Sequence, residues 1–293
     1  MTVIIPLIAI AANWQYLSRI FQPPFTAGEK EANTLKIATY NVDSFGNEQS
    51  GYSCKELAAY MKEHRVDIIC FQEFAGNRYF TPDSIRNAFA DWQYAVIPQA
   101  PDSTPILQVA LFSKYPVKDS RLITYPDSRN CSMWCDLNVD GQTIRVFNNH
   151  LQTTEVSQNK RRLEREMATT ELTGREEAVA KQLLEGLNEN FRKRAAQAKT
   201  LEQLIRTTPY PVLVCGDFNS LPSSYTYSTV KGDNLQDGFQ TCGHGYMYTF
   251  RYFKRLLRID YIFHSKEFKG VDYYSPDLDL CSDHNPVVME VKM

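Results

Sequence analysis

The chain contains 293 residues, of which 43% are hydrophobic and 23% are charged. This composition is ordinary for a globular protein, and it excludes a disordered chain, a collagen-like fibre and a protein built of many membrane-spanning helices. The 32 basic and 34 acidic residues leave a net charge of −2. The overall charge therefore gives no indication of a nucleic-acid partner, although a local basic patch is still compatible with one.

Residues 1–33 are predicted to form an apolar arm followed by a linker. The run at positions 3–12 is apolar but only half as long as the roughly 20 residues that a spanning helix needs, and no basic residue precedes it as in a signal peptide. Trp14, Tyr16 and Arg19 follow in an order that is typical of a membrane interface. Two interpretations remain open: a hydrophobic arm packed on the domain, or the exit end of a membrane segment.

From residue 34 onward, strands alternate with helices. Residues 53–64 have helical spacing. Asp140-Gly141 separates two β-rich runs and predicts a hairpin. A long charged helical region is expected at 154–206, with interruptions at Gly174 and Gly186. The remaining β-rich runs are 35–42, 66–74, 109–113, 116–125, 211–219, 256–265 and 286–293.

These elements predict one α/β domain over residues 34–293. The strands are rich in antiparallel connections, and the helices are expected to pack outside them. The run at 66–74 is continuously apolar, as expected for a strand whose two faces are both covered.

Polar side chains recur where the apolar strands end, which is where α/β proteins often place their sites. Each of them has an ordinary structural explanation when taken alone, since Ser, Asp and Asn also form turns and helix caps. A carboxylate at the end of a buried strand nevertheless needs a partner. The candidates are Asn41, Asp43, Glu73, His150, Asp217, Asn219, Asp260, Asp283 and His284.

The residue types in this set indicate a metal-assisted reaction on phosphate. Carboxylate-rich oxygen sites suit Mg²⁺ or Mn²⁺ rather than zinc, and such ions act on phosphoryl oxygens. No zinc spacing of cysteine and histidine is present in the sequence. The sequence also has no G-x-S-x-G turn and no phosphate-binding P-loop, which disfavours a serine hydrolase and a nucleoside triphosphatase.

The ordered motifs TYNVD, QEF, NNHLQ, GDFNS, RIDYIF and SDHNP resemble those of the endonuclease/exonuclease/phosphatase superfamily. The resemblance extends from about Leu35 to the end of the chain. It implies a four-layer α/β sandwich, in which two mainly antiparallel sheets lie face to face with helices outside. It also implies hydrolysis of a phosphoester by in-line attack of water, without a covalent enzyme intermediate.

The resemblance assigns roles to the motif residues. Glu73 corresponds to the principal Mg²⁺ ligand, with Mn²⁺ as a substitute, and Asn41, Asp43 and Asp283 stand beside it as further ligands. Asp217 would orient or deprotonate the attacking water. The other catalytic residues would hold the phosphate or orient a group that does; they are His150, Asn219, Asp260 and His284, with Asp260 paired to His284.

A basic, aromatic segment precedes the RIDYIF motif, and four of its cations are candidates for substrate binding: Arg251, Lys254, Arg255 and Arg258. The segment could bind nucleic-acid phosphates and stack bases, or meet anionic lipid headgroups. It could also be a solvated hairpin. The expected substrate is accordingly nucleic acid or a phospholipid headgroup. A sugar or inositol phosphatase, and a non-catalytic binding module on the same fold, are the alternatives.

Two features depart from a minimal catalytic domain. Residues 154–190 are expected to be a helical insertion between the NNHLQ and GDFNS motifs. The apolar arm makes the chain similar to membrane-anchored bacterial members of the superfamily, with membrane contact through residues 1–22; without such an anchor the protein would be cytoplasmic. No obligate protein partner is implied.

Overall fold

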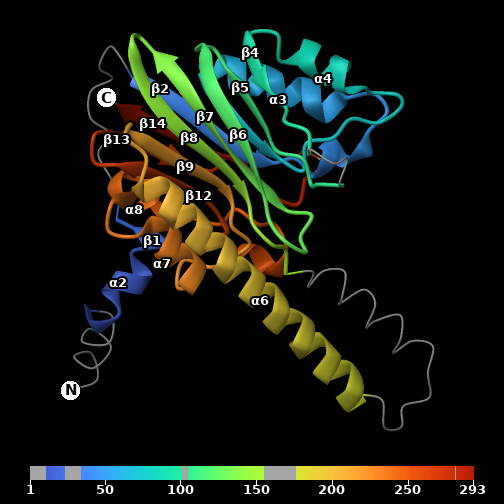
Figure 1. Ribbon diagram of the computed structural model, residues 1–293, viewed down its shortest axis with the longest axis vertical. Helices are drawn as coiled ribbons and strands as arrows, with labels where there is room; N and C mark the ends of the chain where they lie inside the picture. The colour runs from blue at the N-terminus through green and yellow to red at the C-terminus, as the bar shows by residue number, and fades with distance from the viewer. Residues whose placement is uncertain (1–10, 24–33, 101–104, 155–175, 281) are drawn as a thin grey trace.

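The computed structural model describes residues 11–23, 34–100, 105–154, 176–280 and 282–293. Most of its strands belong to two six-stranded sheets (Figure 1). In spatial order, the first sheet contains β13 (Lys269–Tyr274), β14 (Val287–Lys292), β2 (Thr34–Asn41), β3 (Ile68–Gln72), β5 (Ala110–Ser113) and β4 (Tyr94–Val96). The second contains β10 (Leu235–Asp237), β12 (Asp260–Ser265), β9 (Val212–Asp217), β8 (Gln142–His150), β7 (Cys131–Val139) and β6 (Val117–Thr124).

Both sheets are mainly antiparallel, with one parallel pair in each. The parallel pairs are β2 with β3 and β8 with β9. Asp140 and Gly141 form the two-residue turn between β7 and β8, and both have positive φ angles, as this kind of turn requires. The predicted hairpin is thus confirmed.

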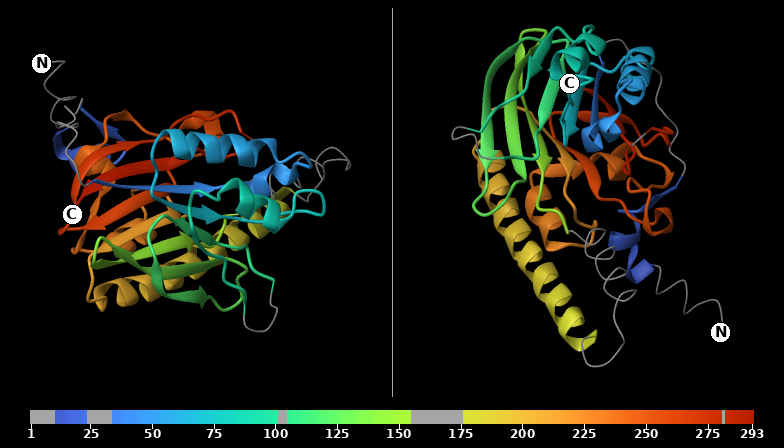
Figure 2. Two further views of the ribbon diagram at one scale, coloured as in Figure 1. Left: turned by 90° about the horizontal axis from the view of Figure 1, so that it is seen from above. Right: turned by 90° about the vertical axis from the view of Figure 1, so that its right-hand side faces the viewer.

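Helices cover the outer face of each sheet, which gives four layers (Figure 2). Helices α3 (Tyr52–Glu63) and α4 (Pro82–Ala88) pack on the sheet that contains β2 and β3. Helices α6 (Glu176–Arg206) and α7 (Tyr225–Lys231) pack on the other sheet. The inner faces of the two sheets share a core that includes Ile37, Cys70, Leu213 and Cys215. The predicted sandwich is confirmed. Every residue of the central strand β3 is buried, which explains why all of them except the last, Gln72, are apolar.

Helix α6 passes through Gly186 without a break. The expected interruption at this residue is therefore wrong, because one glycine costs only about 1 kcal/mol in a helix that is otherwise rich in alanine and leucine. The helix also continues across residue 190, so that part of the expected insertion and the helix before β9 are a single element. Gly174 and positions 155–175 lie outside the described residues.

The N-terminal arm packs on the domain where it is described. It contains α2 (Trp14–Leu17) and β1 (Phe21–Gln22), and β1 pairs with β11 (Gly245–Tyr246). Ser18 accepts a hydrogen bond from Gln240 in α8 (Gly238–Cys242) at 2.9 Å. Figure 1 shows this arm alongside α7 and α8. No helix in the described part of the chain is long and apolar enough to cross a membrane.

Candidate active site

The polar residues at the strand ends meet at one end of the sandwich. Asn41 ends β2, and Glu73 directly follows β3, which is paired to β2 in parallel. In the opposite sheet, His150 and Asp217 end the parallel strands β8 and β9 and are register partners. Asp260 begins the antiparallel neighbour β12 and is paired with Asp217 on the other side. The register of each sheet therefore places its polar residues at the same end of the strands.

The side chain of Asn41 makes hydrogen bonds to both sheets at this end of the sandwich. Its amide nitrogen donates hydrogen bonds to Glu73 Oε1 and to Asp217 Oδ2, both at 3.1 Å. Its amide oxygen accepts the backbone N–H of Asp43 at 3.1 Å. A buried amide with these partners holds two carboxylates from different sheets in a fixed relation.

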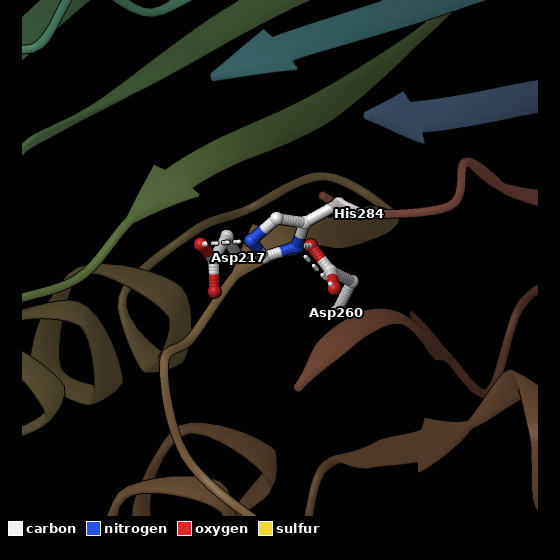
Figure 3. Close-up of side chains that lie close together, drawn as sticks. All are labelled: Asp217, Asp260 and His284. Carbon is white, nitrogen blue, oxygen red and sulfur yellow. Dashed lines mark hydrogen bonds and ion pairs between the residues drawn. The ribbon is translucent and has the colours of Figure 1, made fainter. Parts of the chain in front are cut away.

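His284 lies between two aspartates (Figure 3). Its Nδ1 donates to Asp260 Oδ2 at 2.9 Å, and its Nε2 is 3.7 Å from Asp217 Oδ2. Burial opposes the charged imidazolium, but the carboxylates of Asp260 and Asp217 outweigh burial and raise the pKa of His284 to about 10. The predicted Asp260–His284 pair is thus present, and the other ring nitrogen of His284, Nε2, faces Asp217.

His150 is the second histidine of the site, and it is completely buried. Its Nε2 lies 3.5 Å from Glu73 Oε1 and 3.8 Å from Asp217 Oδ2. Neither ring nitrogen makes a hydrogen bond with the described residues. Burial lowers the pKa of His150, and the nearby carboxylates oppose this only in part. Buried polar atoms are rarely left unpaired without a functional reason, so His150 is suited to contact a ligand.

Asp217 is held rigidly by the turn that follows β9. Its carboxylate accepts the backbone N–H of Asn219 at 2.8 Å and the side-chain amide of Asn219 at 3.1 Å. Burial raises the pKa of Asp217 to about 6, while His284 opposes the shift. Asn219 and Glu73 both have φ near +49°. Strained backbone of this kind is concentrated at functional sites.

Three carboxylates form the more exposed part of the site, called the acidic opening below: Asp43, Glu73 and Asp283. Partial burial, followed by repulsion from Glu73 and Asp283, raises the pKa of Asp43 to about 6. Crowded oxygen ligands of like charge suit a hard divalent cation, which would relieve their repulsion. The described residues therefore fit a cation at Glu73, with Asp43 and Asp283 beside it. Asn41 turns its amide nitrogen toward Glu73 and so orients that carboxylate.

A second group of possible ligand atoms lies deeper in the site. Atoms of Asp217, Asp260 and His284 come within 4.8 Å of one another. A histidine must be neutral to bind a metal ion, whereas the carboxylates around His284 favour its protonated form. Without a bound ion the three residues interact with one another, and both this trio and the carboxylates beside Glu73 offer ligand atoms for a cation.

The four cations of the basic segment differ in exposure and in their partners. Lys254 and Arg255 are exposed in the short helix η2 (Phe253–Arg255). Arg251 bonds Asp277 and Asn285. Arg258 is wholly buried and forms a two-pronged ion pair with Asp237, at 2.6 and 2.8 Å. The prediction that Arg258 binds substrate is wrong, because its guanidinium is committed to a partner inside the domain.

Buried side chains hold the backbone of the two residues that follow His150, and the sequence did not predict these hydrogen bonds. Arg194 in α6 donates to the backbone oxygen of Gln152 at 2.6 Å, and the backbone N–H of Gln152 donates to Gln197 at 2.8 Å. Asn130 and Asn219 both donate to the backbone oxygen of Leu151 at 3.0 Å. The spacing of Arg194 and Gln197 places them on one helix face. These residues were missed from the sequence because, within a strongly charged helix, this spacing is also typical of a face exposed to solvent.

Comparisons with known proteins agree with this architecture. The model of the endonuclease/exonuclease/phosphatase family matches residues 38–284. Among curated proteins, no sequence matches the chain. An endonuclease/exonuclease/phosphatase from Bacteroides vulgatus is 20% identical, with a TM-score of 0.64 over 89% of this chain and 99% of the other.

Two further solved structures differ in what they act on. TDP2 from D. rerio, solved with a single-strand DNA product, is 16% identical, with a TM-score of 0.59 over 89% of this chain and 99% of its own. A mannosyl-6-phosphatase from Bacteroides thetaiotaomicron is 16% identical, with a TM-score of 0.59 over 88% of this chain and 100% of its own. At such identities the similarity shows a shared fold.

Proposed function

Because the chain belongs to the endonuclease/exonuclease/phosphatase family, we propose that it is a hydrolase that cleaves phosphoesters with a bound divalent cation, Mg²⁺ or its substitute Mn²⁺. The observation that carries the proposal is the convergence of Asp217 and the Asp260–His284 pair behind an acidic opening at Glu73. This arrangement combines a carboxylate for water, cationic and neutral donors for phosphate, and oxygen ligands for a metal.

Glu73 would hold the cation, with Asp43 and Asp283 completing the acidic opening and Asn41 fixing the Glu73 carboxylate. When bound, the cation neutralises charge on the phosphoryl group and on the leaving oxygen. Three carboxylates without a counter-ion would instead repel an anionic substrate, so the same residues explain why the reaction would need the metal.

Asp217 is the group best placed to orient the attacking water and accept its proton. It is held by Asn219 and is flanked by both histidines. The water oxygen forms a bond to phosphorus while the opposite P–O bond breaks, and the proton passes to the Asp217 carboxylate. The leaving oxygen departs with the electron pair of the broken bond.

The two histidines and Asn219 would stabilise the phosphoryl oxygens during this step. His284 offers Nε2–H from a ring that Asp260 holds at Nδ1, and His150 offers a buried ring nitrogen that has no other hydrogen bond among the described residues. Removing one preorganised donor of this kind typically costs about 10²–10³ in rate.

The substrate is proposed to be a phosphodiester of nucleic acid or of a phospholipid headgroup. The DNA-bound TDP2 supports the first of these by analogy of fold. A sugar or inositol phosphate is the second candidate, and the mannosyl-6-phosphatase with the same fold favours it. A non-catalytic binding module would have no need for a buried, strained and partly unpaired set of acids and histidines.

One comparison on purified protein tests the proposal. Supercoiled plasmid, sphingomyelin vesicles and a sugar 6-phosphate are each offered with Mg²⁺, with Asp217→Asn as the inactive variant and the exposed-helix substitution Glu63→Gln as the matched control. We expect one substrate to be hydrolysed by the wild type and the control only, and chelator to abolish the reaction. Hydrolysis that persists in Asp217→Asn, or in chelator, would refute the proposed site.

A further inference from the structure

Two segments far apart in the sequence form one exposed aromatic surface. Phe21 in β1 is paired with Tyr246 in β11, and directly opposed residues of antiparallel strands project from the same face. The Tyr246 hydroxyl donates to the backbone oxygen of Leu256 at 2.9 Å. The aromatic surface, as named here, consists of these three residues with Tyr252 and Phe253, and each of the five is between 46% and 60% exposed.

The aromatic surface borders the candidate active site. Phe250 contacts the rings of both Tyr252 and Phe253, and its ring centroid lies 5.0 Å from that of His284. The N-terminal arm is firmly attached to the same region, because Arg258 donates to the backbone oxygen of Arg19 at 2.7 Å. A partner that covers the aromatic surface would therefore be held close to His284.

The charges of this region favour lipid over nucleic acid. A protein that follows a nucleic-acid backbone neutralises several phosphates with basic side chains. Here Arg258 is buried against Asp237, and Arg251 and Arg255 share the single carboxylate of Asp277, so these two keep only one net positive charge. Among the described residues, Lys254 is the cation of the segment that has no acidic partner. One or two cations among exposed aromatic and aliphatic side chains instead suit a bilayer surface.

The sequence that enters the arm has the same character. Positions 3–10 read VIIPLIAI, and they lead through Trp14 and Tyr16, which are also exposed. Aromatic residues of this kind gather at the headgroup level of membranes, where one part of the side chain is apolar and another polar. Contiguous exposed apolar patches, unlike single exposed apolar side chains, mark interaction sites.

We propose that the aromatic surface docks on the surface of an anionic lipid bilayer, with Tyr252, Phe253 and Leu256 entering the headgroup layer and Lys254 meeting the anionic headgroups. The N-terminal arm contributes Phe21 to this surface, and the segment before β12 contributes the other four residues. Docking goes beyond the proposed hydrolase activity and does not depend on it, because vesicle binding is measured without turnover.

The test is sedimentation of the full chain with vesicles, in chelator, using pure phosphatidylcholine and an equimolar mixture with phosphatidylglycerol. We expect binding to the mixed vesicles that falls about tenfold in Tyr252→Ser/Phe253→Ser, from the loss of buried apolar area. The matched control is Tyr94→Ser/Tyr210→Ser. These tyrosines begin β4 and precede β9, at the end of the strands opposite the site, and the control should bind like the wild type.

Two single variants keep the test decisive if the double variant folds poorly, which circular dichroism would reveal. Leu256→Ser should weaken binding to both vesicle types. Lys254→Glu should weaken binding to the anionic vesicles about fivefold or more, as expected near such a surface for one cation, and leave neutral vesicles unchanged. The proposal is overturned if the wild type does not sediment with anionic vesicles or if these variants bind normally. It is equally overturned if the loop variants lose oligonucleotide binding while vesicle binding persists.

Discussion

Asp260 and His284 are joined by a 2.9 Å hydrogen bond between the first residue of β12 and a loop just before β14. The backbone N–H of Asp260 donates to Thr249 Oγ1 at 3.1 Å, and the backbone N–H of His284 donates to Ser282 Oγ at 3.0 Å. Both members of the pair are thus held by their own backbone as well as by each other. A ring fixed in this way can point its other nitrogen at Asp217.

This pair predicts how the stability of the metal-free protein depends on pH. The pKa of His284 is raised from 6.5 to about 10, so the stabilisation is fully present below pH 6.5 and is lost as the pH rises through about 10. We expect Asp260→Asn to cost about 3 kcal/mol at pH 7, as when one partner of a buried ion pair is removed, and less at high pH. Urea unfolding in chelator across this range measures it. A cost that does not change with pH would contradict the assignment. The control is Asp91→Asn, which removes the exposed ion pair between Lys62 and Asp91.

Glu73→Gln is expected to weaken Mg²⁺ binding strongly, because it removes a charged ligand from the acidic opening while preserving shape. The fold should survive, since Glu73 is only partly buried. Isothermal titration with Mg²⁺ or Mn²⁺ measures the change, and Glu63→Gln on the exposed side of α3 is the matched control. Unchanged affinity in Glu73→Gln would place the cation elsewhere.

Gly216→Ala is expected to destabilise the protein by about 3 kcal/mol, as strained or clashing core substitutions do. Gly216 has φ of +133°, and a Cβ there would lie 1.9 Å from the backbone oxygen of Asn149. Gly186→Ala in α6 is the contrasting variant, because its Cβ would meet nothing within 4 Å, and we expect it to stabilise by up to about 1 kcal/mol. Thermal unfolding of both variants measures the two changes in stability. Equal changes would show that crowding beside Asp217 is not the reason for a glycine at position 216.

Arg258→Met should lower the free energy of unfolding by about 3–5 kcal/mol, because it leaves Asp237 as an unpaired buried charge. The double variant Arg258→Met/Asp237→Leu should recover much of this loss. Lys254→Met, at an exposed cation of the same segment, should leave stability nearly unchanged. Chemical denaturation distinguishes the cases, and a mild effect of Arg258→Met alone would count against a structural role for the ion pair.

Arg194→Met is expected to lower kcat by about 10–100-fold, the range typical of residues that orient a site from behind. The loss should appear in kcat more than in KM, because Arg194 acts by holding the turn after His150 through the backbone of Gln152. Arg194→Lys should recover part of the activity, and Arg192→Met on the exposed face of α6 should have none of the effect. A normal kcat in Arg194→Met would show that the other contacts to Leu151 and Gln152 hold the turn.

Much of the fold could be predicted because its signals are local. The Asp140-Gly141 turn and the apolar run that begins β3 each depend on neighbouring residues. The approximate site could also be predicted, since each polar candidate directly ends or follows a strand and strands of one sheet end together. The break expected at Gly186 failed because the surrounding residues of α6 favour helix strongly enough to override one glycine.

The sequence by itself determined the strand-rich sandwich, the family motifs and the strand ends at which the chemistry is proposed to occur. Only the tertiary structure decided which charges are free, because a charge is neutralised by whatever residue lies beside it in space. Arg258 and Lys254 are four residues apart, yet one is buried against Asp237 and the other is exposed. For the same reason the pairing of Phe21 with Tyr246, across more than two hundred residues, has no signature in the local pattern.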